Sequence, residues 1–339
     1  MDRHRKIMRW TGSAALSAIT AVFAFVTLST ADEATHLNSR SNAASSLDSK
    51  LAYTRFAGEN AGQERDDNGL KLKFVWCPPG LFTMENRFGT EMHLVRPMPV
   101  EKPENDDVAI DDLTEAIFVD ARITVQPVRV FLKRGYWLGK YEVTRAEWQD
   151  VMHTEPWANR KIAVEGRDFP ATYVSWNDAT EFCRRLTAEE RKVGRLPVGW
   201  EYTLPTDAQW ERACRANSKT EFSFGDDQSV LGDYAWFRGN TRGRGEPFPH
   251  QVGQKKPNQW GLFDMHGNAL EWCRDWWGTV PGGIEPETTQ ANPMWPNKVQ
   301  RGGDSSRDAP ACRSSARDMS APELRKSEFG FRVALSTVH

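Results

Sequence analysis

The sequence predicts an α+β fold with few, short helices and strands and much irregular structure. Two observations lead to this prediction. Three segments between residues 144 and 215 begin with helix-capping patterns, and helical periodicity disappears after about residue 216. The 339 residues also include 14 Trp, 25 Gly and 19 Pro. Many large aromatic residues among many turn formers indicate a compact domain whose loops are held by aromatic anchors.

The N-terminal residues have the pattern of a secretory signal peptide. Four basic residues precede an apolar stretch at 11–31, which ends in Ser29-Thr30-Ala31 before Asp32. We expect cleavage after Ala31, so that residues 1–31 are a signal peptide and the protein is exported, either periplasmic or secreted. The alternative is a membrane anchor formed by an uncleaved signal, because the stretch is nearly long enough to span a bilayer. No other membrane segment is predicted.

The next segments change composition sharply. Residues 32–69 are polar and rich in Ala, Ser, Asn and Asp, which is typical of a flexible linker. Ordered structure is predicted from residue 70, where LKLKFVWCPPGLFTM (70–84) joins a β-prone run to Pro-Pro-Gly, and residues 70–339 are predicted to form one domain. Residues 97–127 are Pro-rich and acidic and read as an insertion. The stretch 128–143 then predicts a β-hairpin that turns at Lys133–Gly135.

Three helices are predicted from capping boxes. The pattern places a Ser or Thr three residues before an acid or Gln, as in Thr144–Glu147, Ser175–Asp178 and Thr206–Gln209. The second of these precedes apolar residues at helical spacing, which predicts one buried face. Short strands and loops are expected after the third helix.

Charge and cysteine content limit the partners and the compartment. The net charge of −2 gives no electrostatic reason to expect a nucleic-acid partner. Five cysteines are present, at positions 77, 183, 214, 273 and 312. Because five is odd, at least one is free or bonds another chain, and an exported protein can form disulfides. The seven histidines show no metal-binding spacing, so zinc and non-haem iron have little support.

The stretch DMHGNALEW (264–272) is the best metal candidate on chemistry alone. Asp264 and Glu271 are carboxylates that flank a Gly-Asn turn, which can direct backbone carbonyls inward. Calcium prefers such a mixture of carboxylate and carbonyl oxygens. The alternative is an ordinary turn with two solvated acids. His266, inside the turn, is expected to be a surface or hydrogen-bonded residue rather than a ligand.

Seven segments taken together resemble one family. In order, they are FVWCPPGLFTM, YWLGKYEVTRAEW, ATYVSWNDATEFCRRL, YTLPTDAQWERACR, NQWGLFDMHGNALEWCRDWW, RGG and ARDMSAPELRKSEFGFRVA. Their order and spacing over residues 70–335 are similar to those of the formylglycine-generating enzymes, also called sulfatase-modifying factors. The resemblance implies a variant of the C-type-lectin fold with structural calcium. It implies calcium ligation by the side chains of Asp264 and Glu271 and by the carbonyls of Gly267 and Ala269. Trp236 occupies the position of an amide ligand of a second calcium site, which is therefore expected to be lost or remodelled.

The resemblance also implies a reaction, and this sequence departs from the residues that the reaction needs. Active relatives oxidise a substrate cysteine to formylglycine with a Cu(I) ion held by two thiolates, which suit that soft ion. Counting forward from Gly302-Gly303 places Cys312 at the second thiolate and Arg307 at the first. Counting backward from GFRV places Cys312 beyond the second, so neither count gives a pair. Asp304 replaces a serine, and Leu270 replaces a tryptophan that lines the oxygen pocket. We therefore expect no copper.

Cys312 has several possible roles. A Cys273–Cys312 disulfide would close a loop of about 40 residues and contribute about 2–4 kcal/mol. The resemblance implies bridges from Cys183 and Cys214 to the last strands, but the partner positions are Val333 and Ser314 here. Cys214 could instead reach Cys312, because residues i and i+2 share a strand face. The remaining alternatives are a free buried thiol and a redox or ligand role.

Three functions are compatible with the sequence. The first is an exported binding or scaffold module that recognises a sulfatase-like protein, a peptide or a glycan. The second is an extracytoplasmic oxidoreductase with different chemistry, in which Asp304, Arg307 and Cys312 are the candidate catalytic residues. The third is a formylglycine generator that uses the Cys312 thiol alone.

Overall fold

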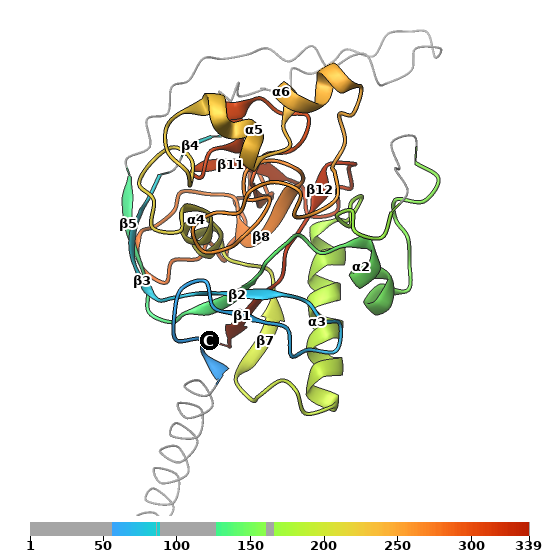
Figure 1. Ribbon diagram of the computed structural model, residues 1–339. Coiled ribbons are helices and arrows are strands. Elements are labelled where there is room, and N and C mark those ends of the chain that lie inside the picture. The colour runs from blue at the N-terminus through green and yellow to red at the C-terminus, as the bar shows by residue number, and fades with distance from the viewer. Residues whose placement is uncertain (1–55, 86, 89–126, 161–165, 339) are drawn as a thin grey trace, which may run out of the picture. The chain divides into compact units, whose positions relative to one another are not determined.

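The computed structural model describes residues 56–85, 87–88, 127–160 and 166–338 (Figure 1). The predicted signal peptide, most of the predicted linker and nearly all of the predicted insertion lie outside these residues. The fold begins earlier than predicted. Phe56 packs on Trp200 with ring centroids 5.0 Å apart, and β1 (Glu64–Arg65) pairs with β2 (Phe74–Cys77). Residues 56–69 are therefore part of the domain, and the linker prediction was wrong for them.

The first sheet has five antiparallel strands in the order β1-β2-β6-β13-β7. It joins both ends of the described chain, because β13 (Ala334–Thr337) lies between β6 (Tyr136–Gly139) and β7 (Trp200–Thr203). Leu335 is paired with Trp137 on one side and with Tyr202 on the other. The last strand is thus fixed in the middle of the sheet.

The second sheet has the order β12-β8-β10-β11-β4. Its long strands are β8 (Leu270–Trp276), β10 (Lys298–Arg301) and β11 (Ala316–Ser320), which pair antiparallel. The short β12 (Phe329–Gly330) and β4 (Arg87–Phe88) pair parallel at the two edges. A third sheet contains β3 (Gly80–Met84), β5 (Val128–Leu132) and β9 (Gly283–Ile284).

The predicted hairpin over 128–143 was wrong, although both of its strands and its turn exist. β5 pairs with β3 in the third sheet, whereas β6 pairs with β2 in the first. The chain forms one long antiparallel ribbon that changes sheets at Pro78–Pro79 on one strand and at Lys133–Gly135 on the other. Gly135 allows this bend, because a Cβ there would lie 2.2 Å from the Trp76 ring.

All three predicted helices are confirmed with their capping boxes: α2 (Arg145–Met152), α3 (Trp176–Lys192) and α4 (Asp207–Arg215). Further helical elements are single turns, including α5 (Leu231–Tyr234), α6 (Arg238–Thr241) and a 3-10 turn at Ala309–Cys312. Figure 1 shows α3 beside β7, and α4 near the middle of the domain.

The main core forms where α4 contacts β3, β8 and β10. Trp210 and Cys214 of α4 belong to the same buried cluster as Cys273 of β8 and Val299 of β10. The predicted α+β fold with short elements and much irregular structure is confirmed. In the part of the chain that the structure describes, no helix has the length and apolar character needed to cross a bilayer.

Candidate functional site

One face of the second sheet forms the floor of a pocket of about 200 Å³. Side chains alternate between the two faces of a strand, and directly paired residues on neighbouring strands share a face. Gln300 of β10 is paired with Asp318 of β11 and with Trp272 of β8. Leu270 and Ala316 lie two residues along these strands and belong to the same face. We call this cavity the Gln300 pocket; Leu270, Gln300, Ala316 and Asp318 line its floor.

The loop after β10 covers the Gln300 pocket with Gly303, Arg307 and Ala311. The loop turns back sharply because Gly302 and Gly303 have φ values of +96° and +71°. A Cβ on Gly303 would lie 2.7 Å from the carbonyl oxygen of Ala311 and 2.8 Å from the Cys312 sulfur. Glycine at this position therefore lets the turn that carries Cys312 pack directly against the loop.

The opposite face of the sheet is held by buried ion pairs. Arg301 is fully buried, and its guanidinium donates to Asp207 and, over 2.9 Å, to Glu211 of α4. Arg317 forms a second ion pair with Asp207, at 2.8 Å. These contacts fix β10 and β11 against α4, and they make the floor of the Gln300 pocket rigid.

Arg307 lies between two acids at the edge of the Gln300 pocket. Its Nη2 donates to Asp318 Oδ2 over 2.8 Å, and its Nε lies 3.4 Å from Asp304 Oδ2. Asp304 is fully buried and accepts hydrogen bonds from the backbone and hydroxyl of Ser306. Burial raises the pKa of the Asp304 carboxyl. The positive charge of Arg307 is thus largely compensated by the two neighbouring acids.

Cys312 lies near Asp304 and Arg307, the other two candidate catalytic residues, but its thiol is inaccessible. The residue is fully buried among Phe222, Leu231 and Ala309. Burial raises the pKa of the Cys312 thiol well above its usual range. Only the deprotonated thiolate acts as a nucleophile or a metal ligand. The buried Cys312 side chain stays protonated, and the neutral thiol does neither.

The Cys273–Cys312 disulfide considered from the sequence is not formed, and that prediction was wrong. All five cysteines belong to the described residues, and all five are free and buried. Cys273 lies in the main core with Trp210, whereas Cys312 belongs to a separate apolar cluster. The Cys214 sulfur contacts the Met265 carbonyl and His266 instead of Cys312.

His266 holds the turn that carries Cys312. Its Nδ1 lies 2.8 Å from the Cys312 carbonyl, and its Nε2 lies 2.8 Å from the Ser223 hydroxyl and accepts from the Ser223 amide. Since a carbonyl only accepts, Nδ1 carries the proton. Burial lowers the pKa of His266 to about 4, so the ring is neutral near pH 7. The expectation of a hydrogen-bonded turn histidine is confirmed, and the residue is buried rather than superficial.

A buried acid cluster surrounds the predicted calcium ligands Asp264 and Glu271. Glu271 is bound by Arg332 through two 2.6 Å hydrogen bonds and also accepts from Trp210 Nε1. Glu142 was not predicted; its Oε1 accepts from Asn268 and from the amide of Ala269. Burial and the negative charges of Asp264 and Glu271 raise the pKa of Glu142. Burial likewise raises the pKa of Asp264 to about 6.

The acid cluster fits a calcium ion in charge and in part of its ligand set. Three carboxylates face one guanidinium, which leaves an excess of negative charge in a buried region. Asp264 Oδ1 and Glu142 Oε2 are buried without a hydrogen-bond partner. Both oxygens of Glu271, by contrast, are engaged by Arg332 and Trp210. Gly267 adopts a φ of +106° beside the Trp236 carbonyl, as a sharp turn requires. Within the described residues, no group of three or more His, Cys, Asp or Glu side chains forms a ready metal site.

The position expected to have lost a second calcium site is filled by packed side chains. The Trp236 ring stacks on His250 with centroids 3.9 Å apart. The Lys255 ammonium lies 3.9 Å from the centroid of the Trp236 ring and donates to the Gly232 carbonyl. A cationic side chain therefore stands beside the residue that replaces the amide ligand.

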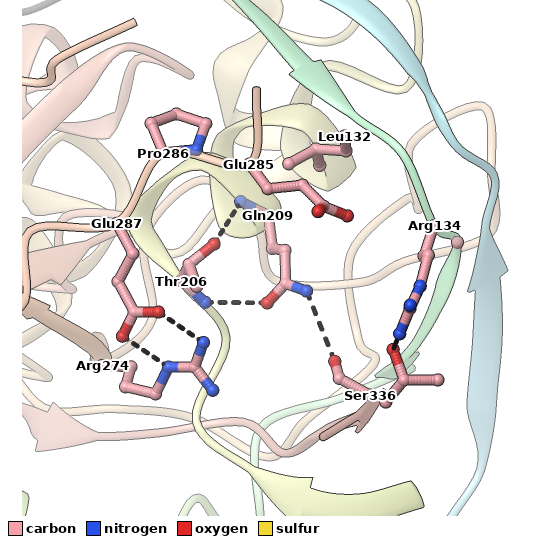
Figure 2. Close-up of a pocket in the computed structure, with 11 residues that line it drawn as sticks. Leu132, Arg134, Thr206, Gln209, Arg274, Glu285, Pro286, Glu287 and Ser336 are labelled. Atoms are coloured by element: carbon pink, nitrogen blue, oxygen red, sulfur yellow. Dashed lines mark hydrogen bonds and ion pairs between the residues drawn. The ribbon is translucent and has the colours of Figure 1, made fainter. Parts of the chain in front are cut away.

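A second pocket, of about 420 Å³, lies where β5, α4 and β13 meet (Figure 2). Its polar groups pair with one another: Arg274 binds Glu287 through two hydrogen bonds, and Gln209 joins Thr206 to Ser336. None of the described buried side-chain atoms that line this pocket lacks a partner. We therefore place the candidate site at the Gln300 pocket.

Sequence reasoning missed Gln300, Glu142 and Arg332. Glu142 and Arg332 are polar residues within β-prone runs rich in apolar side chains (YWLGKYEV and FGFRVAL), which was the available signal. Gln300 stands in the polar stretch KVQRGG, which gave no comparable signal. Their importance depends on pairing between distant strands, which a single sequence does not show.

Comparisons with known proteins agree with the seven shared segments. The sequence profile of the Sulfatase-modifying factor enzyme 1-like domain matches residues 61–337. The chaperone protein LppX of Paenibacillus barcinonensis is 28% identical over 183 residues, which are 42% of this chain and 62% of the relative. The formylglycine-generating enzyme of Bos taurus is 31% identical over 179 residues, 49% of this chain and 44% of the relative. That of Streptomyces coelicolor is 28% identical over 304 residues, 77% of this chain and 88% of the relative.

The chain thus spans 62% and 44% of the length of the first two of these relatives. Among solved structures, PvdO from Pseudomonas aeruginosa superposes with a TM-score of 0.61 at 22% identity, covering 82% of this chain and all of that protein. Treponema denticola variable protein 1 gives a TM-score of 0.53 at 25% identity, covering 78% and 95%. Because the profile matches residues 61–337, which are most of the chain, the protein belongs to the sulfatase-modifying factor, or formylglycine-generating enzyme, family.

Proposed function

We propose that this protein is an exported binding module of the family that does not convert cysteine to formylglycine with copper. The observation that carries the proposal is the state of Cys312. Its thiol is buried and its pKa is raised, and Arg307 occupies the other position where the family resemblance places a thiolate. The Gln300 pocket would then be a binding site on a rigid sheet. It would lack the two copper-binding thiolates that the family resemblance implies.

Electrostatics supports the same proposal. Cu(I) is held by soft thiolates, and a linear two-sulfur site needs both of them. Arg307 brings a guanidinium to this place, and the guanidinium is tied to Asp318. A second cation beside it would be repelled, and no other cysteine is near in sequence to replace the missing ligand. A relative that is named as a chaperone shows that the family sequence is shared by proteins whose names describe other roles.

A peptide-oxidation assay tests the proposed loss of activity. The purified protein would be incubated with Cu(I), oxygen, a thiol reductant and a cysteine-containing peptide of the sulfatase type. We expect no formylglycine by mass spectrometry, and the same result for Cys312→Ser. Formylglycine that is produced by the wild type and lost in Cys312→Ser would support the single-thiol enzyme instead.

A second candidate function is an extracytoplasmic oxidoreductase with different chemistry. It is favoured by one observation: Asp304 is buried, has a raised pKa and lies beside Arg307. Such perturbed acids in clefts are typical of functional sites. Turnover of a small-molecule or protein substrate that depends on Asp304 and survives Cys312→Ser would favour this enzyme over a binding module.

Calcium and export belong to the same proposal. We propose that calcium clamps the loop at Asp264–Glu271, with Glu142 and Asp264 as its carboxylate ligands and with carbonyl oxygens of Gly267 and Ala269. We also propose export by cleavage after Ala31. N-terminal sequencing of the mature protein tests the second point: a chain that begins at Asp32 supports it, and an intact N-terminus supports the membrane-anchored alternative.

A further inference from the structure

Three exposed apolar side chains form a continuous row across the third sheet. Leu81 of β3 is paired directly with Phe131 of β5, and Phe131 is paired with Ile284 of β9. Figure 1 shows β3 and β5 side by side. Paired residues on neighbouring strands share a face of the sheet. The three side chains are 50%, 40% and 59% exposed, so they lie on the face that points away from the core. We call this surface the Phe131 row.

The fold itself does not need the Phe131 row. The sheet packs on the core with its other face, where Met84, Val130 and Leu132 are buried. Single exposed apolar residues are common, but a contiguous apolar patch is typical of an interaction surface. The two outer strands of this sheet, β3 and β9, each contribute one residue of the row. Apolar edge strands are usually covered or charged, because they otherwise promote association. We therefore expect a partner to cover the row.

Cationic side chains border the Phe131 row. Arg129 lies two residues before Phe131 on the same strand face, and Lys133 and Arg134 follow the strand directly. All three cations are exposed. Arg134 donates to the Thr337 hydroxyl. Among the residues that the structure describes, neither Arg129 nor Lys133 has an ion-pair partner. Two positive charges beside the row are thus available to a partner.

The acid nearest to the row in sequence does not compensate these charges. Glu285 directly follows Ile284, but it lines the pocket of Figure 2 together with Leu132. Leu132 is buried and belongs to the face of the sheet opposite Phe131. The exposed face therefore combines apolar side chains with uncompensated positive charge.

This combination selects among possible occupants. A second copy of the chain, docked by the same surface, would bring the same cations together, and like charges repel. A membrane fits poorly, because Phe131 stands on the same strand face as Arg129 and could not enter hydrocarbon without drawing the charge in. A protein segment with both apolar and acidic side chains matches the whole surface.

We infer that the Phe131 row docks an acidic segment of another protein. Apolar side chains of the segment cover Leu81, Phe131 and Ile284, and its carboxylates pair with Arg129 and Lys133. The inference goes beyond the proposed function, because none of these residues lines the Gln300 pocket. It adds a second surface and the chemistry of the partner that fits it.

Fluorescence anisotropy with two labelled peptides tests the inference. One peptide contains Leu and Glu, and the other has Lys in place of every Glu. We expect saturable binding of the Glu peptide to the wild-type protein, and at least about tenfold weaker binding of the Lys peptide. Phe131→Ser, Ile284→Ser and Arg129→Glu should each weaken binding of the Glu peptide by at least about tenfold. Val198→Ser, at a position that is 88% exposed and outside the third sheet, is the matched control and should bind like the wild type.

Melting temperatures of the variants separate loss of the surface from loss of the fold. Ile284→Ser changes the most exposed side chain of the row, so it should melt like the wild type while binding the Glu peptide more weakly. Equal affinity for the two peptides, binding of neither, or wild-type affinity in Ile284→Ser would overturn the inference.

Three further outcomes would assign the row to another occupant and would equally overturn the inference. The first is a concentration-dependent dimer in analytical ultracentrifugation that Phe131→Ser disperses. The second is binding to phosphatidylglycerol vesicles without binding to the Glu peptide. The third concerns the acidic stretch 97–127 of this chain. If it occupied the row, a variant combining Asp106→Asn, Asp107→Asn, Asp111→Asn and Asp112→Asn would bind the Glu peptide more tightly than the wild type does. We expect the two proteins to bind it equally.

Discussion

Cys312 packs directly behind Gly303, and burial sets the chemistry that its sulfur can perform. The sequence placed Asp304, Arg307 and Cys312 in one region because all three lie close together along the chain. It did not show that the thiol points into an apolar cluster, or that Cys273 lies in another one. Proximity in sequence thus indicated that three neighbouring residues share one region, whereas the position of Cys273 and the burial of the Cys312 thiol depend on tertiary packing.

We expect Cys312 to resist alkylation in the folded protein. Its raised pKa leaves little thiolate at pH 8, and its neighbours exclude the reagent. Mass spectrometry after brief iodoacetamide treatment should find Cys312 unmodified in the native protein. It should find Cys312 modified after unfolding in guanidinium, which serves as the control. Rapid native labelling at Cys312 would contradict the buried-thiol assignment.

Lys298 provides a pH-dependent prediction. Its ammonium lies between Trp176 and Trp276, 4.0 and 3.8 Å from the ring centroids, and burial lowers its pKa to about 8. The unfolded chain keeps this proton up to about pH 10.4, so between pH 8 and 10 it binds more protons than the folded chain. The lysine's contribution to the free energy of unfolding should therefore rise over this range.

Denaturant unfolding of the wild type and of Lys298→Met at pH 8 and pH 10 measures this effect. Groups that titrate in both proteins cancel in the comparison. The stability of the wild type relative to the variant should increase with pH. A constant difference would mean that the pKa of Lys298 is not lowered in the folded state.

At the scale of elements, local signals were sufficient for helices and insufficient for strands. Each capping box at Thr144, Ser175 and Thr206 involves residues only three apart, so the sequence carries the whole signal. The partners of β5 are β3 and β9, and those of β6 are β2 and β13, all of which are distant along the chain. The hairpin prediction failed because two adjacent β-prone runs do not have to pair with each other.

The bend of the long ribbon depends on Gly135. In Gly135→Ala, the added Cβ would meet the Trp76 ring at 2.2 Å and the Cys77 carbonyl at 2.9 Å. Overpacking of this kind typically costs about 1–3 kcal/mol. Thermal or denaturant unfolding should show a loss in this range. Gly243→Ala is the control, because nothing lies within 4 Å of its added Cβ. Equal stabilities of the two variants would be inconsistent with the bend described here.

At the scale of the whole molecule, polar groups at two places form the candidate binding sites. The acid cluster brings together Glu142, which follows β6, with Asp264, which precedes β8, and Glu271 of β8. The Gln300 pocket lies on the second sheet, whose strands all come from residues 87–88 and 270–330. The resemblance predicted the fold and the region of both sites. It did not identify Glu142 or Gln300, because the surroundings of each come from residues that are distant along the chain.

Calcium should stabilise the domain if it occupies the acid cluster. Added Ca²⁺ should raise the melting temperature and EDTA should lower it, because the ion neutralises buried negative charge. Glu142→Gln should remove most of this response, whereas Glu323→Gln at an exposed position should keep it. A melting temperature that is insensitive to both Ca²⁺ and EDTA would exclude a structural calcium at this cluster.

We propose that the loop at Asp304–Cys312 has no thiolate copper site. Titration of the reduced, folded protein with Cu(I) in the presence of a chromogenic copper chelator tests this claim most directly. We predict that the chelator keeps the copper and that Cys312→Ser behaves like the wild type. Withdrawal of one Cu(I) per chain by the wild type, abolished in Cys312→Ser, would contradict it.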